Sequence, residues 1–176
     1  MTAEATPHHF TLTDVACCSY DTATKVAPPL RSEADRQAVR EALADGTIDC
    51  IATDHAPHAT QEKQLEFDQA AFGMVGLETA LGLGLKLVDE KVLTLPTLIE
   101  RLTVGAARVL GLKAGTLGRG APADVTVLDL EAAYKVDPDR FKSKSRNSPF
   151  RGWELRGRVA QTIVGGIVVH EEAARG

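Results

Sequence analysis

The stretch IDCIATDHAPH, residues 48–58, decides the fold class of this chain. Its first part, residues 48–53, is apolar and β-branched, which predicts a short buried strand that ends at Asp54. A helix is predicted directly before it, over residues 32–45, because Ser32 and Asp35 form a capping box and a glycine follows. A helix that leads into a buried strand is typical of a parallel α/β sheet.

The rest of the chain extends this pattern and then departs from it. Helices are predicted over residues 74–88 and from Thr94 to Gly111, and strands over residues 123–128 and 159–169, the last with a Gly-Gly hairpin turn. We therefore expect residues 1–112 to form part of a TIM-type (β/α)8 barrel and residues 113–176 to form a small all-β domain. A whole barrel needs about 250 residues.

Composition excludes several classes of function. The net charge is -4 and basic residues are scattered, so no nucleic-acid partner is expected. No apolar run approaches the length of a membrane span and the N-terminus lacks the pattern of a secretory signal, so we expect a cytoplasmic protein without a membrane partner. The three cysteines form neither a disulfide framework nor a zinc motif, which indicates reduced thiols.

Asp54 and His58 are the strongest candidates for chemistry. An aspartate at the carboxyl end of a barrel strand lies where such enzymes place catalytic groups. Pro57 fixes the intervening turn, so we expect Asp54 and His58 to face one cavity. The alternative is that Asp54 caps a turn and His58 is an ordinary loop residue, which this pattern alone leaves open.

Three further segments carry weaker signals. His8 and His9 would point to opposite sides of an extended chain, so one is expected to line the cavity and the other to be structural. Arg31 ends a proline-rich loop and could bind a carboxylate, or the loop could simply stiffen the chain. Gly73 would let a ligand approach the backbone.

Taken together, these segments resemble the class I, bacterial-type dihydroorotases of the amidohydrolase superfamily. The order and spacing of the motifs agree along nearly the whole chain, and the most specific is the Asp-His-Ala-Pro-His context of Asp54. The matching segments are residues 6–9 (TPHH), 25–31 (KVAPPLR), 49–58 (DCIATDHAPH), 72–73 (FG), 76–78 (GLE), 120–124 (GAPAD), 144–150 (KSRNSPF) and 157–159 (GRV).

The resemblance implies a zinc enzyme that reversibly cyclises N-carbamoyl-L-aspartate to L-dihydroorotate in pyrimidine synthesis. It implies the C-terminal part of a metallo-hydrolase barrel followed by a small β-sandwich domain. Asp54 matches a zinc ligand that is also the general base, His58 a substrate contact, and Phe72 and Gly73 a backbone contact to the ring. Ala27 stands where the family usually has asparagine, so one substrate hydrogen bond is expected to be absent.

In the family, zinc is also held by a His-x-His motif, later histidines and a bridging acidic or carbamylated lysine residue. Only the ligand that matches Asp54 is found in this chain, so we expect the isolated chain to show little turnover and to expose an apolar edge. Two alternatives remain: a non-catalytic subunit that scaffolds aspartate transcarbamoylase, or another cyclic amidohydrolase such as a hydantoinase, dihydropyrimidinase or allantoinase. Besides N-carbamoyl-L-aspartate and dihydroorotate, the expected partner is a second copy of the chain, in a homo-oligomer, or an aspartate transcarbamoylase.

Overall fold

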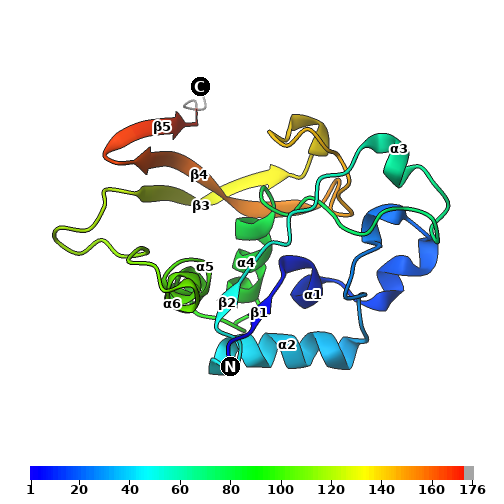
Figure 1. The fold of residues 1–176 in the computed structure, drawn as a ribbon, viewed down its shortest axis with the longest axis horizontal. Coiled ribbons are helices and arrows are strands. Elements are labelled where there is room, and N and C mark those ends of the chain that lie inside the picture. Colours follow the sequence, from blue (N-terminus) through cyan, green and yellow to red (C-terminus); the bar gives the residue numbers. More distant parts are fainter. Residues whose placement is uncertain (173–176) are drawn as a thin grey trace.

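The computed structural model describes residues 1–172, and Figure 1 shows the order of the elements. The first part is mostly helical and contains two short parallel strands, and the last three strands form a separate sheet. The helices are α1 Pro7–Thr11, α2 Glu33–Asp45, α3 Thr60–Lys63, α4 Ala80–Asp89, α5 Leu95–Leu102 and α6 Val104–Leu110; the strands are β1 Glu4–Ala5, β2 Cys50–Ile51, β3 Val125–Lys135, β4 Glu154–Val164 and β5 Ile167–Glu171; and 3-10 turns span Asp14–Ser19, Thr22–Thr24 and Pro138–Arg140.

β1 and β2 lie side by side and run parallel, in the register Glu4 to Cys50 and Ala5 to Ile51. One further hydrogen bond continues the pairing, from the Ala52 amide to the Ala5 carbonyl at 3.0 Å. The strand predicted over residues 48–53 is therefore present but only two residues long. A parallel pair joined through a helix is the repeating unit of an α/β barrel.

α2 begins and ends where the sequence predicts. The Ser32 hydroxyl accepts the Asp35 amide, the Asp35 carboxylate accepts the Ser32 amide, and Gly46 ends the helix with φ 90°. Leu43 points into the core and is fully buried, and Arg40 pairs with Glu90 at the end of α4. The cap fixes where the chain turns toward β2.

α4 begins later than predicted, at Ala80 instead of Met74. Residues 74 and 75 are extended because their backbone groups bond elsewhere: the Met74 carbonyl accepts the Ala56 amide at 2.9 Å, and the Val75 amide donates to the Asn147 carbonyl at 3.0 Å. Once formed, α4 packs closely on α5, since a Cβ on Gly84 would lie 2.7 Å from Leu98. The prediction that its glycines mark close contacts is confirmed there.

β3, β4 and β5 form one antiparallel sheet in that order. The predicted hairpin is present, with Gly165 and Gly166 both at positive φ between β4 and β5. Figure 1 shows α4 between this sheet and the layer of β1, β2 and α2. Within residues 1–172 the three strands make a single sheet, so the second sheet of a sandwich remains a prediction.

One hydrophobic core crosses the predicted boundary at residues 112 and 113. Phe10, Leu83 and Leu98 from the first part belong to the same buried cluster as Phe150 and Leu155 from the second. The sheet is thus packed on the helices through α4 and not tethered only by the chain. None of the helices within residues 1–172 is both long and apolar enough to cross a membrane.

Candidate functional site

Asp54 is placed three residues beyond β2, at the rim of a pocket of about 490 Å³. Its side chain is exposed and its φ is 46°, a conformation that only a few per cent of non-glycine residues adopt. The pocket is built from the end of β1, from α1, from the proline-rich loop and from α2, and its lining includes Thr6, His9, Leu12, Ala27, Pro28, Pro29, Arg31, Asp35, Val39 and Asp54.

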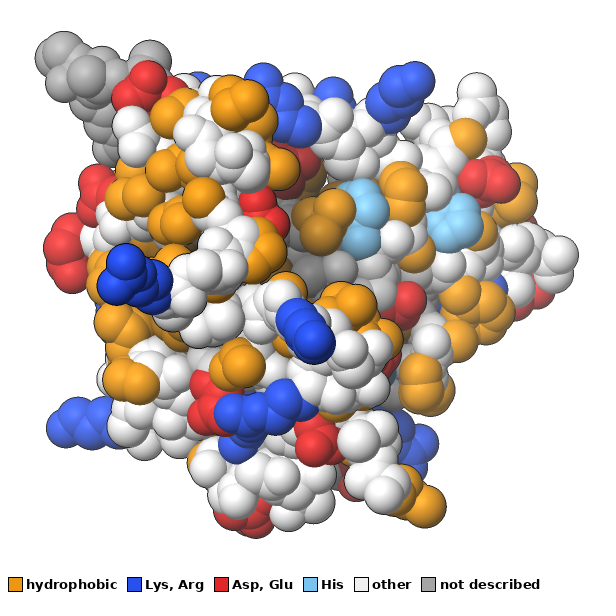
Figure 2. Space-filling view, turned by 60° about the vertical axis from the view of Figure 1, so that its left-hand side comes forward, with side chains coloured by type: hydrophobic (Ala, Val, Ile, Leu, Met, Phe, Trp, Pro, Cys, Tyr) orange, Lys and Arg blue, Asp and Glu red, His pale blue; other side chains and the backbone are white. Residues whose placement is uncertain are grey.

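His9 lies on this pocket because the segment is helical. We predicted the two histidines on an extended backbone, and this is wrong: Thr6 caps α1 and Pro7 occupies its first turn. His9 Nε2 lies 2.9 Å from the Pro28 carbonyl and Nδ1 lies 2.7 Å from the Thr6 hydroxyl. A carbonyl only accepts, so Nε2 carries the proton. The face of the molecule in Figure 2 carries hydrophobic side chains over much of its surface, with charged side chains scattered among them.

His8, its neighbour, points into the core and is 2% exposed. Its Nε2 has no hydrogen-bond partner within residues 1–172. Burial, together with the nearby His9, lowers the pKa of His8 to about 3. His8 is therefore a neutral core residue at physiological pH, and it does not line the pocket of Asp54.

Ala27 and Arg31 come from the predicted proline-rich loop and line the same pocket as Asp54. The Arg31 guanidinium is largely exposed and lies 3.7 Å from Asp35, a loose ion pair in contact with solvent. Such a pair contributes little to stability, so the guanidinium is available to a bound carboxylate. The structure thus brings Asp54, Ala27 and Arg31 together.

His58 lies elsewhere than we predicted. Within residues 1–172 it does not line the pocket of Asp54; its Nε2 lies 2.8 Å from the Phe72 carbonyl and its Nδ1 lies 3.3 Å from Glu62. The turn at Pro57 therefore does not bring the two side chains into this pocket. His58 is instead joined to Phe72, another predicted substrate contact.

Gly73 occupies a backbone conformation that requires glycine. Its φ is 121°, and a Cβ there would lie 2.4 Å from the Cβ of Ala56. Its amide donates to the Lys25 carbonyl at 2.8 Å, while its carbonyl accepts from Lys63 and Asn147. In this structure both backbone groups are therefore used by the protein, so the glycine serves close packing of loops rather than an open backbone contact.

Two lysines, Lys25 and Lys63, hydrogen-bond the loop that leads to Phe72 and Gly73, and sequence reasoning missed both. The Lys25 ammonium donates to the carbonyls of Asp68 and Ala70 and lies 4.5 Å from the centre of the Phe72 ring. The Lys63 ammonium donates to two more carbonyls, and burial, aided by the charge of Lys25, lowers its pKa. Lysines in loops usually signal solvent exposure, so no local pattern distinguishes these two.

A catalytic zinc ion is held by three protein ligands. Within residues 1–172 no three histidine, cysteine or acidic side chains lie close enough together to hold a metal ion. Among the residues that line the pocket, Asp54 is the one that matches a zinc ligand of the family that the sequence resembles. These residues by themselves therefore do not fit a zinc site.

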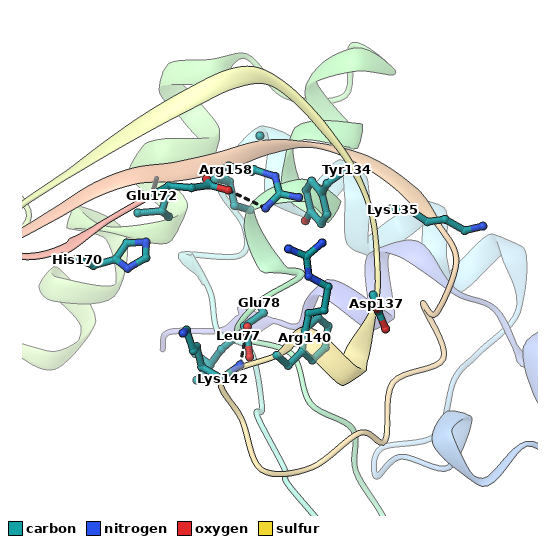
Figure 3. Close-up of a pocket in the computed structure, with 14 residues that line it drawn as sticks. Leu77, Glu78, Tyr134, Lys135, Asp137, Arg140, Lys142, Arg158, His170 and Glu172 are labelled. Carbon is teal, nitrogen blue, oxygen red and sulfur yellow. Dashed lines mark hydrogen bonds and ion pairs between the residues drawn. The ribbon is translucent and has the colours of Figure 1, made fainter. Parts of the chain in front are cut away.

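A second pocket, of about 410 Å³, lies between the start of α4, the sheet and the 3-10 turn at residues 138–140 (Figure 3). Its charged groups largely serve the fold: Arg158 pairs with Glu172 at 2.9 Å and lies over the ring of Tyr134. Glu78 accepts the backbone amides of Lys142 and Ser143. None of the predicted site residues lines it, so we place the candidate site at the Asp54 pocket.

Comparison with known proteins identifies the family of the chain. The family model described as the amidohydrolase family matches residues 2–169. Among curated proteins, a dihydroorotase of Geobacter metallireducens is 56% identical over 97% of this chain, and one of Anaeromyxobacter dehalogenans is 60% identical over 98%. The chain spans 40% of the length of each.

Solved structures show the same likeness. The L-hydantoinase (dihydropyrimidinase) from Arthrobacter aurescens is 33% identical, with a TM-score of 0.91 over 98% of this chain and 40% of its own. A D-hydantoinase is 22% identical with a TM-score of 0.88, which supports the fold alone. By sequence and by fold, the chain belongs to the amidohydrolase family.

Proposed function

We propose that this chain supplies part of the active site of a dihydroorotase, which hydrolyses the ring amide of L-dihydroorotate to N-carbamoyl-L-aspartate and also closes that ring. One observation carries the proposal: identity to dihydroorotases of 53–60% along nearly the whole chain, with Asp54 on a pocket beside Ala27 and Arg31. Because those relatives are longer, the activity belongs to the complete barrel.

The proposed chemistry adds one water to one amide. Asp54 accepts a proton from the attacking water and delivers it to the ring nitrogen as the bond between carbon and nitrogen breaks. An exposed carboxylate on the pocket rim can reach both groups. Two guanidinium groups, of Arg31 and Arg36, line this pocket and could bind a carboxylate in a bidentate manner. Arg36 is paired with Glu33 at 2.6 Å, so we assign the substrate carboxylate to Arg31, whose ion pair is looser.

The proposed substrate-binding residues are His58, Phe72, Gly73 and Ala27. His58 and the Phe72–Gly73 turn are already joined by a hydrogen bond, so substrate binding by this group requires a rearrangement or a contact through other atoms. Ala27 lines the Asp54 pocket directly but offers no polar side chain. We propose that a hydrogen bond made by asparagine in relatives is absent at this position.

Zinc remains part of the proposal through the family resemblance, with Asp54 as the one ligand from this chain. Since the described residues hold no complete metal site, the remaining ligands must come from outside them. We also propose little turnover by the isolated chain, a cytoplasmic location, and a homo-oligomer or an aspartate transcarbamoylase as partner.

A hydantoinase is the second candidate, because a 33% identical L-hydantoinase superposes over almost the whole chain. Both enzymes open cyclic amides, and the ring substituents distinguish them. The higher identity to dihydroorotases favours dihydroorotate, which carries the carboxylate that Arg31 would bind.

The proposal can be tested by replacing the matching two fifths of the Anaeromyxobacter dehalogenans enzyme with this chain. The hybrid should hydrolyse dihydroorotate faster than hydantoin, and Asp54→Asn should lower the rate at least about 100-fold, as expected for loss of a general base. Asp129→Asn, an exposed aspartate of β3 that keeps its acceptor oxygen and does not line the pocket, is the matched control. A full rate in the Asp54→Asn hybrid would refute the assigned role, and faster hydantoin turnover would favour the second candidate.

A further inference from the structure

The segment Ser145–Asn147, between β3 and β4, reaches across the molecule to the two loops that carry His58 and Gly73. The Ser145 hydroxyl donates to the His58 carbonyl at 2.7 Å. The Asn147 side-chain amide donates to the Ala56 carbonyl at 2.9 Å and to the Gly73 carbonyl at 3.1 Å. A short piece of the chain's second part therefore contacts both loops.

Asn147 is placed to join these loops and not merely to fill space. Its side-chain amide donates one hydrogen bond to each loop, and its backbone carbonyl accepts the Val75 amide at 3.0 Å; its side-chain oxygen Oδ1 has no partner within residues 1–172. The residue is 9% exposed, so these bonds are shielded from water. Buried polar groups that lose such partners carry a full desolvation cost, which keeps the amide in place.

The two loops are also linked directly to each other. The Ala56 amide donates to the Met74 carbonyl, and His58 bonds the Phe72 carbonyl. Lys63 also donates to the Gly73 carbonyl, and the Ala71 amide donates to the Glu62 carbonyl, so the Asn147 amide is one of several links. It differs from them because it comes from a segment outside both loops and bonds Ala56 and Gly73 at once.

We infer that Asn147 is a positioning residue for substrate binding: it fixes the distance between the His58 loop and the Phe72–Gly73 turn. This inference rests on the proposed function, in which those residues contact the substrate. Asn147 acts through backbone carbonyls and does not touch the reacting atoms. Asp54, which performs the proposed proton transfer, is not bonded to this segment.

The role predicts a change in KM rather than in kcat. In the dihydroorotase hybrid, Asn147→Ala should raise KM for dihydroorotate at least tenfold and leave kcat within threefold. Ser145→Ala should raise KM less, and Ser145→Thr, which keeps the hydroxyl, should restore it. Glu78→Ala is the matched control, because Glu78 holds residues 142 and 143 of the same stretch without contacting either loop, and its KM should stay within twofold.

Other kinetic outcomes overturn the inference. If Asn147→Ala lowers kcat per mole of protein and leaves KM unchanged, the residue only supports folding. If neither constant changes, the link has no role in binding.

A direct measurement separates failure of this inference from failure of the proposed function. Amide hydrogen exchange on the 176-residue chain needs no activity, and Ala56 and Gly73 should exchange at least tenfold faster in Asn147→Ala than in Glu78→Ala. Unchanged exchange refutes the link whatever the enzyme does. If exchange is faster in Asn147→Ala but the hybrid enzyme does not hydrolyse dihydroorotate, the link between the loops is supported. In that case the proposed substrate is wrong.

Discussion

Replacing His8 by leucine should remove a dependence of folding stability on pH that the unaltered chain shows below neutrality. His8 is buried and neutral in the fold, with a pKa of about 3, while a histidine in the unfolded chain has a pKa near 6.5. As pH falls below 6.5 the unfolded state binds a proton that the folded state does not. The stability that comes from burying a neutral ring is therefore complete above pH 6.5 and is lost progressively toward pH 3.

The size of the effect follows from the difference between the two pKa values. Each unit of pH between them costs about 1.4 kcal/mol, so the free energy of unfolding should fall by about 2 kcal/mol between pH 7 and pH 5 through His8 alone. In His8→Leu this part of the slope disappears. The substitution itself should cost little at pH 7, because His8 Nε2 has no hydrogen-bond partner to lose within the described residues.

Urea unfolding of the 176-residue chain at pH 7, 6 and 5, followed by the fluorescence of its single tryptophan, measures this slope. The quantity to compare is the difference between the chain and His8→Leu at each pH, because carboxylates titrate in both. His170→Leu, at an exposed histidine of β5, is the matched control and should keep the full slope. If His8→Leu and the unaltered chain lose stability equally between pH 7 and pH 5, His8 is not buried as described.

Three further substitutions test the packing of the fold and of the site. Gly73→Ala forces a Cβ to within 2.4 Å of the Ala56 Cβ at a φ of 121°, so the hybrid enzyme should lose most of its affinity for dihydroorotate, measured as KM. Leu98→Ala opens a cavity beside Gly84 and should lower the free energy of unfolding by about 2 to 5 kcal/mol in urea. Ser32→Ala removes the first hydrogen bond of α2 and should lower the same free energy by about 1 kcal/mol, while Ser32→Asp, which can still cap, should restore it.

The capped helices could be predicted from the sequence because their signals are local. Ser32 with Asp35, Thr94 with the following proline, and Gly111 each bond or turn within a few residues of themselves, and each helix begins or ends there. α1 carried a similar signal, Thr6 followed by Pro7, which is typical of a helix start. We overlooked it because the segment was interpreted as extended.

In the candidate site, too, the residues with local sequence signals could be predicted and those that depend on distant contacts could not. Asp54 could be placed because a buried run ends just before it, and Ala27 and Arg31 could be placed through the loop motif. The separation of His58 from the Asp54 pocket could not be predicted, because it depends on a bond to Phe72, fourteen residues away. Lys25, Lys63 and Asn147 bond backbone carbonyls, and no residue-type pattern reveals which carbonyls those are.

The late position of Asn147 in the chain has a consequence for how the molecule is made. Its bonds to Ala56 and Gly73 span 91 and 74 residues, while α2 and α5 are complete within their own turns. Contacts between distant residues form slowly, because the intervening chain must first be ordered. During synthesis both loops leave the ribosome before Asn147 does, so the bonds of its amide to Ala56 and Gly73 form only after residue 147 has been made. A chain that ends before residue 147 would lack this link between its two loops.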